Sequence, residues 1–205
     1  DDKGDLIIDP NSAVGILEQF KKKYSDFNVT ATFFLNGGLF AQPKYNDDIL
    51  ICLVNNGYDI GNHTKNHIKI TDFSISDTIK NIAIMYQTFD RIIPNKYVKI
   101  VSLPYGYPLS KNHANFPYIL AGTYGEYKYI TDATLRVGSE PTYSPYDTRF
   151  DKTYLQRVRA WDNNGIDDIE MTFKKLVKTR YISSGDNNIV IPKDKEDDFY
   201  LEIQR

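Results

Sequence analysis

Short β-rich runs alternate with amphipathic helical stretches along the first half of the chain, and this alternation constrains the fold most. Residues 29–35 (VTATFFL) and 98–103 favour strands, whereas residues 13–24 and 79–93 place apolar side chains at helical spacing. Strands that alternate with helices predict a parallel sheet with the helices outside it. In such sheets and barrels, ligands bind at the carboxyl ends of the strands. We therefore expect the chemistry where these strands end.

Capping and breaking residues mark where the expected helices begin and end. Asn11 or Ser12 is expected to cap the first helix, and Ser74 or Ser76 a long helix that Pro94 ends. Between these two, Asn46 is expected to cap a helix that Asn56-Gly57 closes. Weaker patterns elsewhere favour a hairpin arm at 6–8, helices at 113–120 and 166–177, strands at 127–137, 155–161 and 188–191, and a surface loop at 138–150.

Two of the three histidines follow one of these strands. His63 and His67 lie four residues apart, just after the short apolar run from Tyr58 to Gly61. If the chain turns helical at Asn62, both imidazoles project from one helix face and can converge on one metal ion. The same spacing also suits helix caps, surface residues or hydrogen-bonded core groups. A second strand ends in Leu103-Pro104-Tyr105-Gly106, so the strand-end rule places both stretches on one rim.

Length, charge and cysteine content bound the classes of function. A chain of 205 residues is long enough for one well-developed core, so residues 1–205 are expected to form a single domain. The net charge of -2 gives no reason to expect a nucleic-acid or acidic-lipid partner. No apolar run approaches the length of a membrane span. Cys52 is the only cysteine, so we expect a buried, inert thiol without a disulfide.

Three ordered stretches resemble landmarks of the polysaccharide deacetylases, carbohydrate esterase family four. They are Ala31-Thr32-Phe33-Phe34-Leu35-Asn36-Gly37, then Asn56 to His67, and then Leu103-Pro104-Tyr105-Gly106. Their order and spacing are similar to those of the family over roughly the first half of the chain. The resemblance implies an α/β fold, a deformed (β/α) barrel of the polysaccharide deacetylase type, whose N-terminal strand is incomplete here. It also implies a metal site on the barrel rim and an extracellular or cell-envelope location.

The same resemblance implies the metal ligands. The two metal-binding histidines of the family correspond to His63 and His67, and Asp1-Asp2 lies near the place of its paired aspartates. Asp2 is then the third ligand and Asp1 the catalytic base, around Zn²⁺ or another divalent ion whose bound water attacks an acetamide. As an alternative, residues 1–9 are the remnant of an inserted hairpin and the true aspartates lie outside this chain. Terminal charged residues are also commonly solvated and mobile.

The residues expected to contact the substrate follow from the same resemblance. The backbone N–H of Tyr105 is expected to stabilise the oxyanion, and Pro104 and Tyr105 are expected to contact the substrate. Trp161 follows Arg157 and Arg159 and is expected to wall an acetyl pocket, although a core tryptophan beside a turn fits the pattern equally well. The implied activity is removal of N-acetyl groups from an N-acetylated polysaccharide, peptidoglycan or a chitin-like polymer.

Two departures from the family pattern leave the activity open. Leu103 stands where the family usually has an arginine that orients the catalytic aspartate, and leucine supplies neither hydrogen bonds nor charge. No histidine follows His113, whereas the family usually has a late histidine that protonates the leaving amine. The alternatives are therefore an active hydrolase, a catalytically degraded member that binds glycan or metal without turnover, and a barrel-like domain whose histidines are structural.

Overall fold

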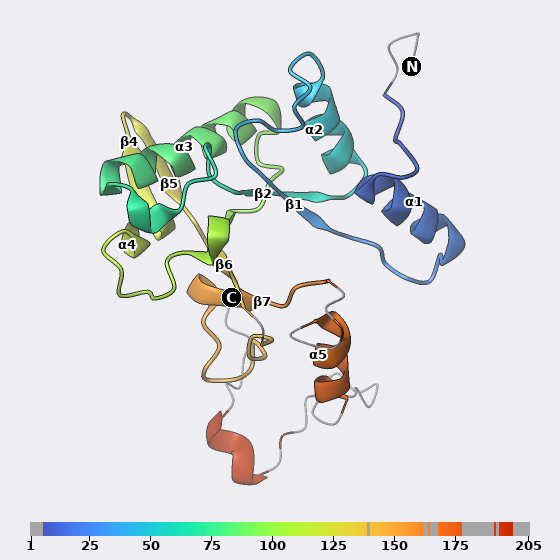
Figure 1. The fold of residues 1–205 in the computed structure, drawn as a ribbon, viewed down its shortest axis with the longest axis vertical. Coiled ribbons are helices and arrows are strands. Elements are labelled where there is room, and N and C mark those ends of the chain that lie inside the picture. Colours follow the sequence, from blue (N-terminus) through green and yellow to red (C-terminus); the bar gives the residue numbers. More distant parts are fainter. Residues whose placement is uncertain are drawn as a thin grey trace.

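Five parallel strands form the central sheet of the computed structural model, which describes residues 6–138, 140–161, 164, 168–177, 191 and 193–198. Each neighbouring pair is parallel, which confirms the expected parallel α/β sheet. Among the described strands the sheet is open, with β1 and β7 at its edges, so the expected deformed (β/α) barrel stays a prediction beyond the parallel sheet itself. The spatial order is β1 (Thr32–Leu35), β2 (Asp59–Asn62), β3 (Ile100–Ser102), β6 (Ala133–Val137) and β7 (Leu155–Arg157), and Figure 1 shows β1 beside β2 and β6 beside β7.

Serine side chains start two of the helices. Ser12 precedes α1 (Ala13–Lys23), and its Oγ atom accepts a hydrogen bond from a main-chain N–H group in the first turn. Ser74 precedes α3 (Ile75–Ile92) in the same way, and this helix ends two residues before Pro94. An N-cap oxygen satisfies one of the N–H groups that have no partner inside a helix. Both expected helix starts are confirmed.

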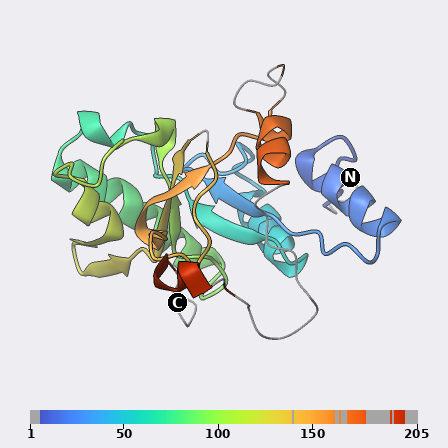
Figure 2. The same ribbon diagram turned by 90° about the horizontal axis from the view of Figure 1, so that it is seen from below.

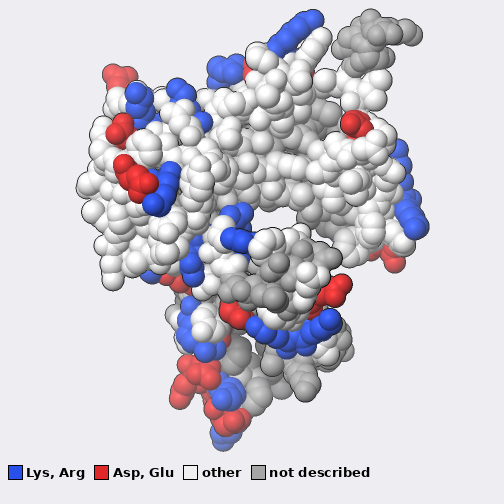
Figure 3. Space-filling model, viewed as in Figure 1, with Lys and Arg blue, Asp and Glu red and all other residues white. Residues whose placement is uncertain are grey.

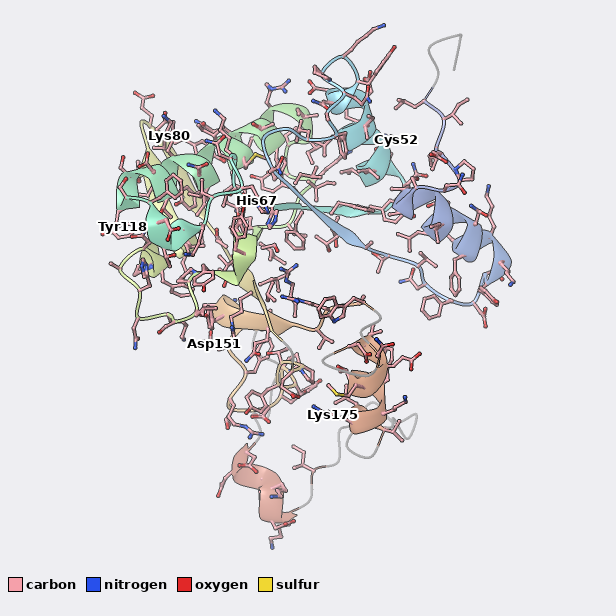
Figure 4. The ribbon with its side chains drawn as sticks, in the orientation of Figure 1. Cys52, His67, Lys80, Tyr118, Asp151 and Lys175 are labelled. Atoms are coloured by element: carbon pink, nitrogen blue, oxygen red, sulfur yellow. The ribbon has the colours of Figure 1, made fainter. Side chains whose placement is uncertain are left out.

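The helix α2 (Asn46–Asn55) starts differently from the expectation. Asn46 is its first residue and not its cap, because the Oδ1 atom of Asn46 accepts from two N–H groups of the preceding loop. The helix ends as expected, since Gly57 follows with a φ of +83°. Cys52 on this helix is half-buried instead of buried, forms no disulfide among the described residues, and lies well apart from His67 in Figure 4.

The hydrophobic core lies between the sheet and the helices α2 and α3, which cover one side of it in Figure 1. Fully burying one large apolar side chain contributes roughly 1.5–3 kcal/mol, so the apolar stripe of α3 anchors this helix firmly. The core therefore fixes the ends of β2 and β3 relative to α3. Its fully buried members include Leu50 from α2, Ile60 from β2, Ile82, Met85 and Phe89 from α3, and Val101 from β3.

An antiparallel hairpin was not predicted by the sequence pattern. Its strands are β4 (Ala121–Tyr124) and β5 (Tyr127–Ile130), and it packs on α3. Gly125 opens the two-residue turn with a φ of +60°, a conformation that glycine adopts without steric cost. The single extended segment expected at 127–137 is therefore two strands, β5 and β6, in different sheets. Figure 2 shows the hairpin and α1 at opposite ends of the molecule.

The remaining elements follow the expectations in part. Residues 6–8 form no hairpin arm, and the Ile7 side chain is 68% exposed. The expected strand at 188–191 lies outside the described residues except for Ile191, which is in no strand. In the described part of the chain, no helix has both the length and the apolar character that a membrane crossing requires. Shorter helices are η1 (Ile70–Asp72), η2 (Pro104–Gly106), α4 (Phe116–Leu120), η3 (Lys152–Tyr154), α5 (Ile169–Leu176) and η4 (Lys193–Asp198).

Candidate active site

The carboxyl ends of β2 and β3 lie side by side and carry the two stretches expected on one rim. β2 ends at Asn62 and is followed directly by His63. β3 ends at Ser102, and η2 begins two residues later at Pro104. Figure 4 shows His67 beside the ribbon of η2. The parallel sheet therefore brings the histidine stretch and the proline stretch together at the edge where such sheets bind ligands.

The imidazole rings of His63 and His67 meet, but by a different route from the one that their spacing suggested. No helix forms between Asn62 and His67, so the helical premise is wrong. Thr64 and His67 instead have φ angles of +60° and +50°, which turn the chain back and bring the ring centroids within 4.7 Å, edge to face. A non-glycine residue in this conformation costs of order 1–3 kcal/mol, and such strain collects at functional sites.

Asn62 ties this turn to α3. The Nδ2 group of Asn62 donates to the carbonyl oxygen of Ile82 at 3.0 Å, and its Oδ1 atom accepts from the N–H of Thr64 at 2.9 Å. Both Asn62 and Thr64 are fully buried, and the Thr64 hydroxyl accepts from the N–H of Ile68 at 3.2 Å. Buried polar groups need such partners. Asn62 thereby holds Thr64 in its left-handed conformation and sets the path of the chain toward His67.

The outer part of the turn is clamped between α3 and the loop after β1. The carbonyl oxygen of Asn81 accepts from the N–H of Lys65 at 2.9 Å, and its Oδ1 atom accepts from the N–H of Asn66 at 3.0 Å. On the other side, the N–H of Gly37 donates to the Lys65 carbonyl oxygen at 2.7 Å. A Cβ atom on Gly37 would lie 2.7 Å from that oxygen, so glycine is what permits this close approach.

His63 adopts the tautomer that leaves one ring nitrogen for a ligand. Its Nδ1 atom lies 2.6 Å from the carbonyl oxygen of Ser102. Because a carbonyl oxygen only accepts, Nδ1 carries the proton and Nε2 keeps its lone pair. Burial lowers the pKa of His63, and electrostatic interactions with His67 and Arg157 lower it further, against the opposing effect of the hydrogen bond to Ser102. A neutral imidazole oriented by a carbonyl is the form in which histidine binds metals.

Tyr105 closes the rim on the side of β3. Its φ is +55°, its ring centroid lies 4.8 Å from that of His67, and its side chain is 62% exposed. In the described part of the chain the N–H of Tyr105 has no protein acceptor, whereas the N–H of Gly106 donates to the Leu103 carbonyl oxygen. An unused N–H beside two imidazoles can bind an oxygen atom of a ligand. Pro104, the first residue of η2, is buried.

The two histidines supply only part of the expected metal site. Among the described residues, no group of three His, Cys, Asp or Glu side chains is close enough to hold an ion. The expected third ligand, Asp2, and the expected base, Asp1, lie outside the described residues. Leu103, at the place of the family's arginine, is fully buried in the core. His63 and His67 fit the nitrogen donors of the expected set, and its acidic donors stay a prediction.

Trp161 lies at the carboxyl end of β7, on the other side of β3 from the histidines' strand. It lines a pocket together with Arg157, Arg159 and Val137. The guanidinium carbon of Arg159 lies 4.9 Å from the centre of the Trp161 ring, and the Trp161 side chain is 42% exposed. This exposure excludes a core tryptophan. The exposed position of Trp161 in this pocket allows the expected contact with a substrate, and that contact stays a prediction.

Sequence patterns did not single out Asn62, Asn81 or Ser102. Asn81 did carry a signal, because it is a polar residue next to the core-facing stripe of a long helix, where a polar side chain needs a partner. Ser102 carried none, because it orients His63 through a main-chain carbonyl that any residue supplies. Its own hydroxyl is buried without a hydrogen-bond partner in the described part of the chain.

Comparisons with known proteins bear on the first half of the chain. A sequence model of the polysaccharide deacetylase family matches residues 11–116. A search of the curated proteins gives no match. The solved structure of the peptidoglycan deacetylase PdaC from Bacillus subtilis is 26% identical, with 49% of this chain and 46% of that chain covered and a TM-score of 0.38. The structure of the Bc1960 peptidoglycan N-acetylglucosamine deacetylase is 28% identical, with 47% and 44% covered and a TM-score of 0.36.

The extent of these matches differs between the family and the individual structures. The match to this chain spans less than half the length of either solved structure. The family match, in contrast, spans β1, the two histidines and η2, the elements that build the rim described above. Because it covers just over half of the 205 residues, the chain belongs to the polysaccharide deacetylase family.

Proposed function

We propose that this chain is a metal-dependent hydrolase that removes N-acetyl groups from an amino-sugar polysaccharide, peptidoglycan or a chitin-like polymer. The observation that carries the proposal is the imidazole pair of His63 and His67, 4.7 Å apart on the rim, with His63 oriented by Ser102. Family membership supports the reaction class, and both matched structures are named as peptidoglycan deacetylases. An extracellular or cell-envelope location and a single catalytic domain over residues 1–205 belong to the same proposal.

Each residue of the rim has a role in this proposal. His63 and His67 would hold a zinc ion or another divalent cation, with Asp2 as the third ligand. When bound, such an ion supplies a Lewis acid that polarises the acetamide carbonyl. The N–H of Tyr105 donates to the carbonyl oxygen as negative charge develops there. Asp1 accepts a proton from the attacking water, and the products are acetate and a free amine.

The substrate contacts come from η2 and from the segment after β7. Tyr105 is exposed beside His67, so its ring can pack against a sugar. Trp161 offers a second aromatic wall in the neighbouring pocket. Pro104 is buried, so it acts by supporting the left-handed turn of Tyr105 and not by a wide contact with the substrate.

A second candidate is a degraded family member that binds glycan or metal without turnover. Leu103 favours it, because a fully buried leucine cannot orient a catalytic carboxylate or balance its charge. The sequence also has no histidine after His113 to protonate the leaving amine. Both candidates keep the imidazole pair, so only turnover separates them.

Zinc titration and acetate release test the proposal together. Zinc is expected to raise the thermal midpoint, because a ligand bound only by the folded form stabilises it by about 2.7 kcal/mol at 100 times its Kd. His63→Ala and His67→Ala should lose this rise. His113→Ala removes the third histidine, outside the ring cluster, and should keep it. The active protein should also release acetate from an N-acetylglucosamine oligomer only when the metal is present.

The outcomes separate the candidates. A zinc-dependent rise with acetate release supports the hydrolase, and the same rise with sugar binding but no acetate supports the degraded member. An unchanged thermal midpoint at saturating zinc, with no acetate released, would contradict a metal site at His63 and His67 and leave the two histidines structural.

A further inference from the structure

A pocket beside η2 carries positive charge. It has a volume of about 390 Å³ and is lined by Val137, the last residue of β6, and by residues 157–161. Val137 and Arg157 are register partners in β6 and β7, so their side chains leave the same face of the sheet. A Cβ atom on Gly106 would lie 3.0 Å from the Cβ atom of Val137. The pocket therefore adjoins η2 and the rim that holds Tyr105.

Two guanidinium groups share this pocket, with no acidic neighbour among the residues that the structure describes. Arg157 and Arg159 both line it, and none of the described residues that line it is acidic. Neither arginine takes part in an ion pair of the described residues, and the Nε atom of Arg157 is buried without a hydrogen-bond partner there. Burial lowers the pKa of Arg157, and the charge of Arg159 lowers it further. Like charges without an acidic partner among the described residues favour the binding of an anion.

An aromatic wall flanks the pocket, which adjoins η2 through Val137. Trp161 presents a half-exposed ring against which Arg159 packs. An aromatic face beside two guanidinium groups suits a sugar ring that carries an anionic group. In Figure 3, Lys and Arg atoms border the opening near the middle of the molecule.

We propose that Arg157 and Arg159 bind a carboxylate of the polysaccharide, so that the substrate is an acidic glycan. The carboxylate belongs to the sugar next to the one that presents the N-acetyl group to the rim. This inference rests on the proposed function, because the pocket adjoins the proposed metal site. A planar guanidinium matches a carboxylate with two parallel hydrogen bonds, which makes arginine the suitable residue for such recognition. The other source of a carboxylate at this place is the acetate that the reaction releases.

Trp161 allows a direct test, since it is the only tryptophan of the chain and its fluorescence reports on this pocket. The full chain is titrated with an oligosaccharide of alternating N-acetylglucosamine and glucuronic acid, and with the neutral methyl ester of the same oligosaccharide. We expect the acid to bind about tenfold or more tightly than the ester, because hydrogen bonds between charged partners are strong. Added sodium chloride should reduce this preference.

Variants that remove one positive charge test whether the two arginines cause the preference for the acid over its methyl ester. Arg159→Gln changes an exposed side chain and should fold normally while losing most of the preference for the acid. Arg157→Gln changes the half-buried member of the pair and should act in the same direction. Arg91→Gln is the matched control, because it removes an exposed arginine that pairs with Asp47, away from the pocket, and should keep the preference.

Equal affinities for the acid and the ester would overturn the proposal, and so would a preference that survives in both pocket variants. Equal affinities together with a fluorescence change in sodium acetate alone would assign the arginines to the released product and would also overturn it. The readout needs no turnover. A chain that prefers the acid but releases no acetate would therefore refute the proposed hydrolase and support the carboxylate site.

Discussion

The variant Asn62→Ala tests whether one buried amide holds the imidazole pair in place. The side chain of Asn62 is fully buried and joins the N–H of Thr64 to the carbonyl oxygen of Ile82. Alanine removes both hydrogen bonds and leaves the Thr64 N–H buried without its acceptor. The Ile82 carbonyl keeps its bond within the helix, because Ile82 lies well inside α3. The loss therefore falls on one main-chain donor and on the left-handed turn that leads to His67.

The expected magnitude follows from these two bonds. An unpaired buried N–H costs about 1–3 kcal/mol, and the lost bond to Ile82 costs about 0.5–1.5 kcal/mol. We expect the free energy of unfolding of Asn62→Ala to be lower by about 2–4 kcal/mol. For a chain of this length, that corresponds to a fall in Tm of roughly 5–15 °C. Asn62→Asp keeps the acceptor for Thr64 but buries a carboxylate against the Ile82 carbonyl, so it should be at least as destabilising near neutral pH.

Urea denaturation followed by circular dichroism measures the free energy of unfolding, and a zinc titration of the same variant shows whether the imidazoles still meet. Asn66→Ala is the matched control in the same turn. Asn66 contributes its main-chain N–H while its side chain is exposed, so this variant should stay within about 0.5 kcal/mol of the unchanged protein. If Asn62→Ala equalled Asn66→Ala in stability and in zinc response, the structural role assigned to Asn62 would be refuted.

The remaining predictions concern His63 and Ser102. Burial lowers the pKa of His63 from its usual 6.5. The unfolded chain therefore takes up this proton first, and the free energy of unfolding should decrease as the pH falls from about 6.5 to the lowered pKa. Urea denaturation between about pH 8 and about pH 5 checks this, and an identical pH dependence in His63→Gln would contradict it. Ser102→Ala removes a buried hydroxyl that has no partner among the described residues and keeps the carbonyl that binds His63. Its stability should be unchanged or higher by up to about 1 kcal/mol, with the zinc response kept, and a fall of more than about 1 kcal/mol would show that the hydroxyl is needed.

Local patterns predicted much of the fold because they act between neighbours in the chain. Ser12 and Ser74 cap helices through bonds to residues three positions away, which a sequence displays directly. The hairpin of β4 and β5 escaped prediction although Gly125 marks its turn, because its tyrosine-rich strands resemble the start of a longer extended segment. Asn46 was assigned as a cap from its residue type, whereas its oxygen serves a loop that precedes the helix.

For the site, the sequence by itself determined which residue types are available for chemistry and how far apart they lie along the chain. The alternation of strands and helices predicted a parallel sheet, and the strand-end rule placed His63, His67 and Tyr105 on one rim. These conclusions depend on the periodicity of apolar residues and on the order of strands and helices along the chain, and both can be read without knowing which distant residues are in contact. The helical route between the two histidines was nevertheless wrong, because two left-handed residues, and not helical spacing, bring the rings together.

Only the tertiary structure decided how that turn is held and what lies beside it. Asn62 reaches a carbonyl twenty residues further along the chain, and His63 reaches one thirty-nine residues further. Arg157 comes within electrostatic range of His63 only because β7 joins the same parallel sheet. Contacts of this kind arise when packing of the core brings separate segments together, and no short-range pattern in the sequence records which side chains will then meet.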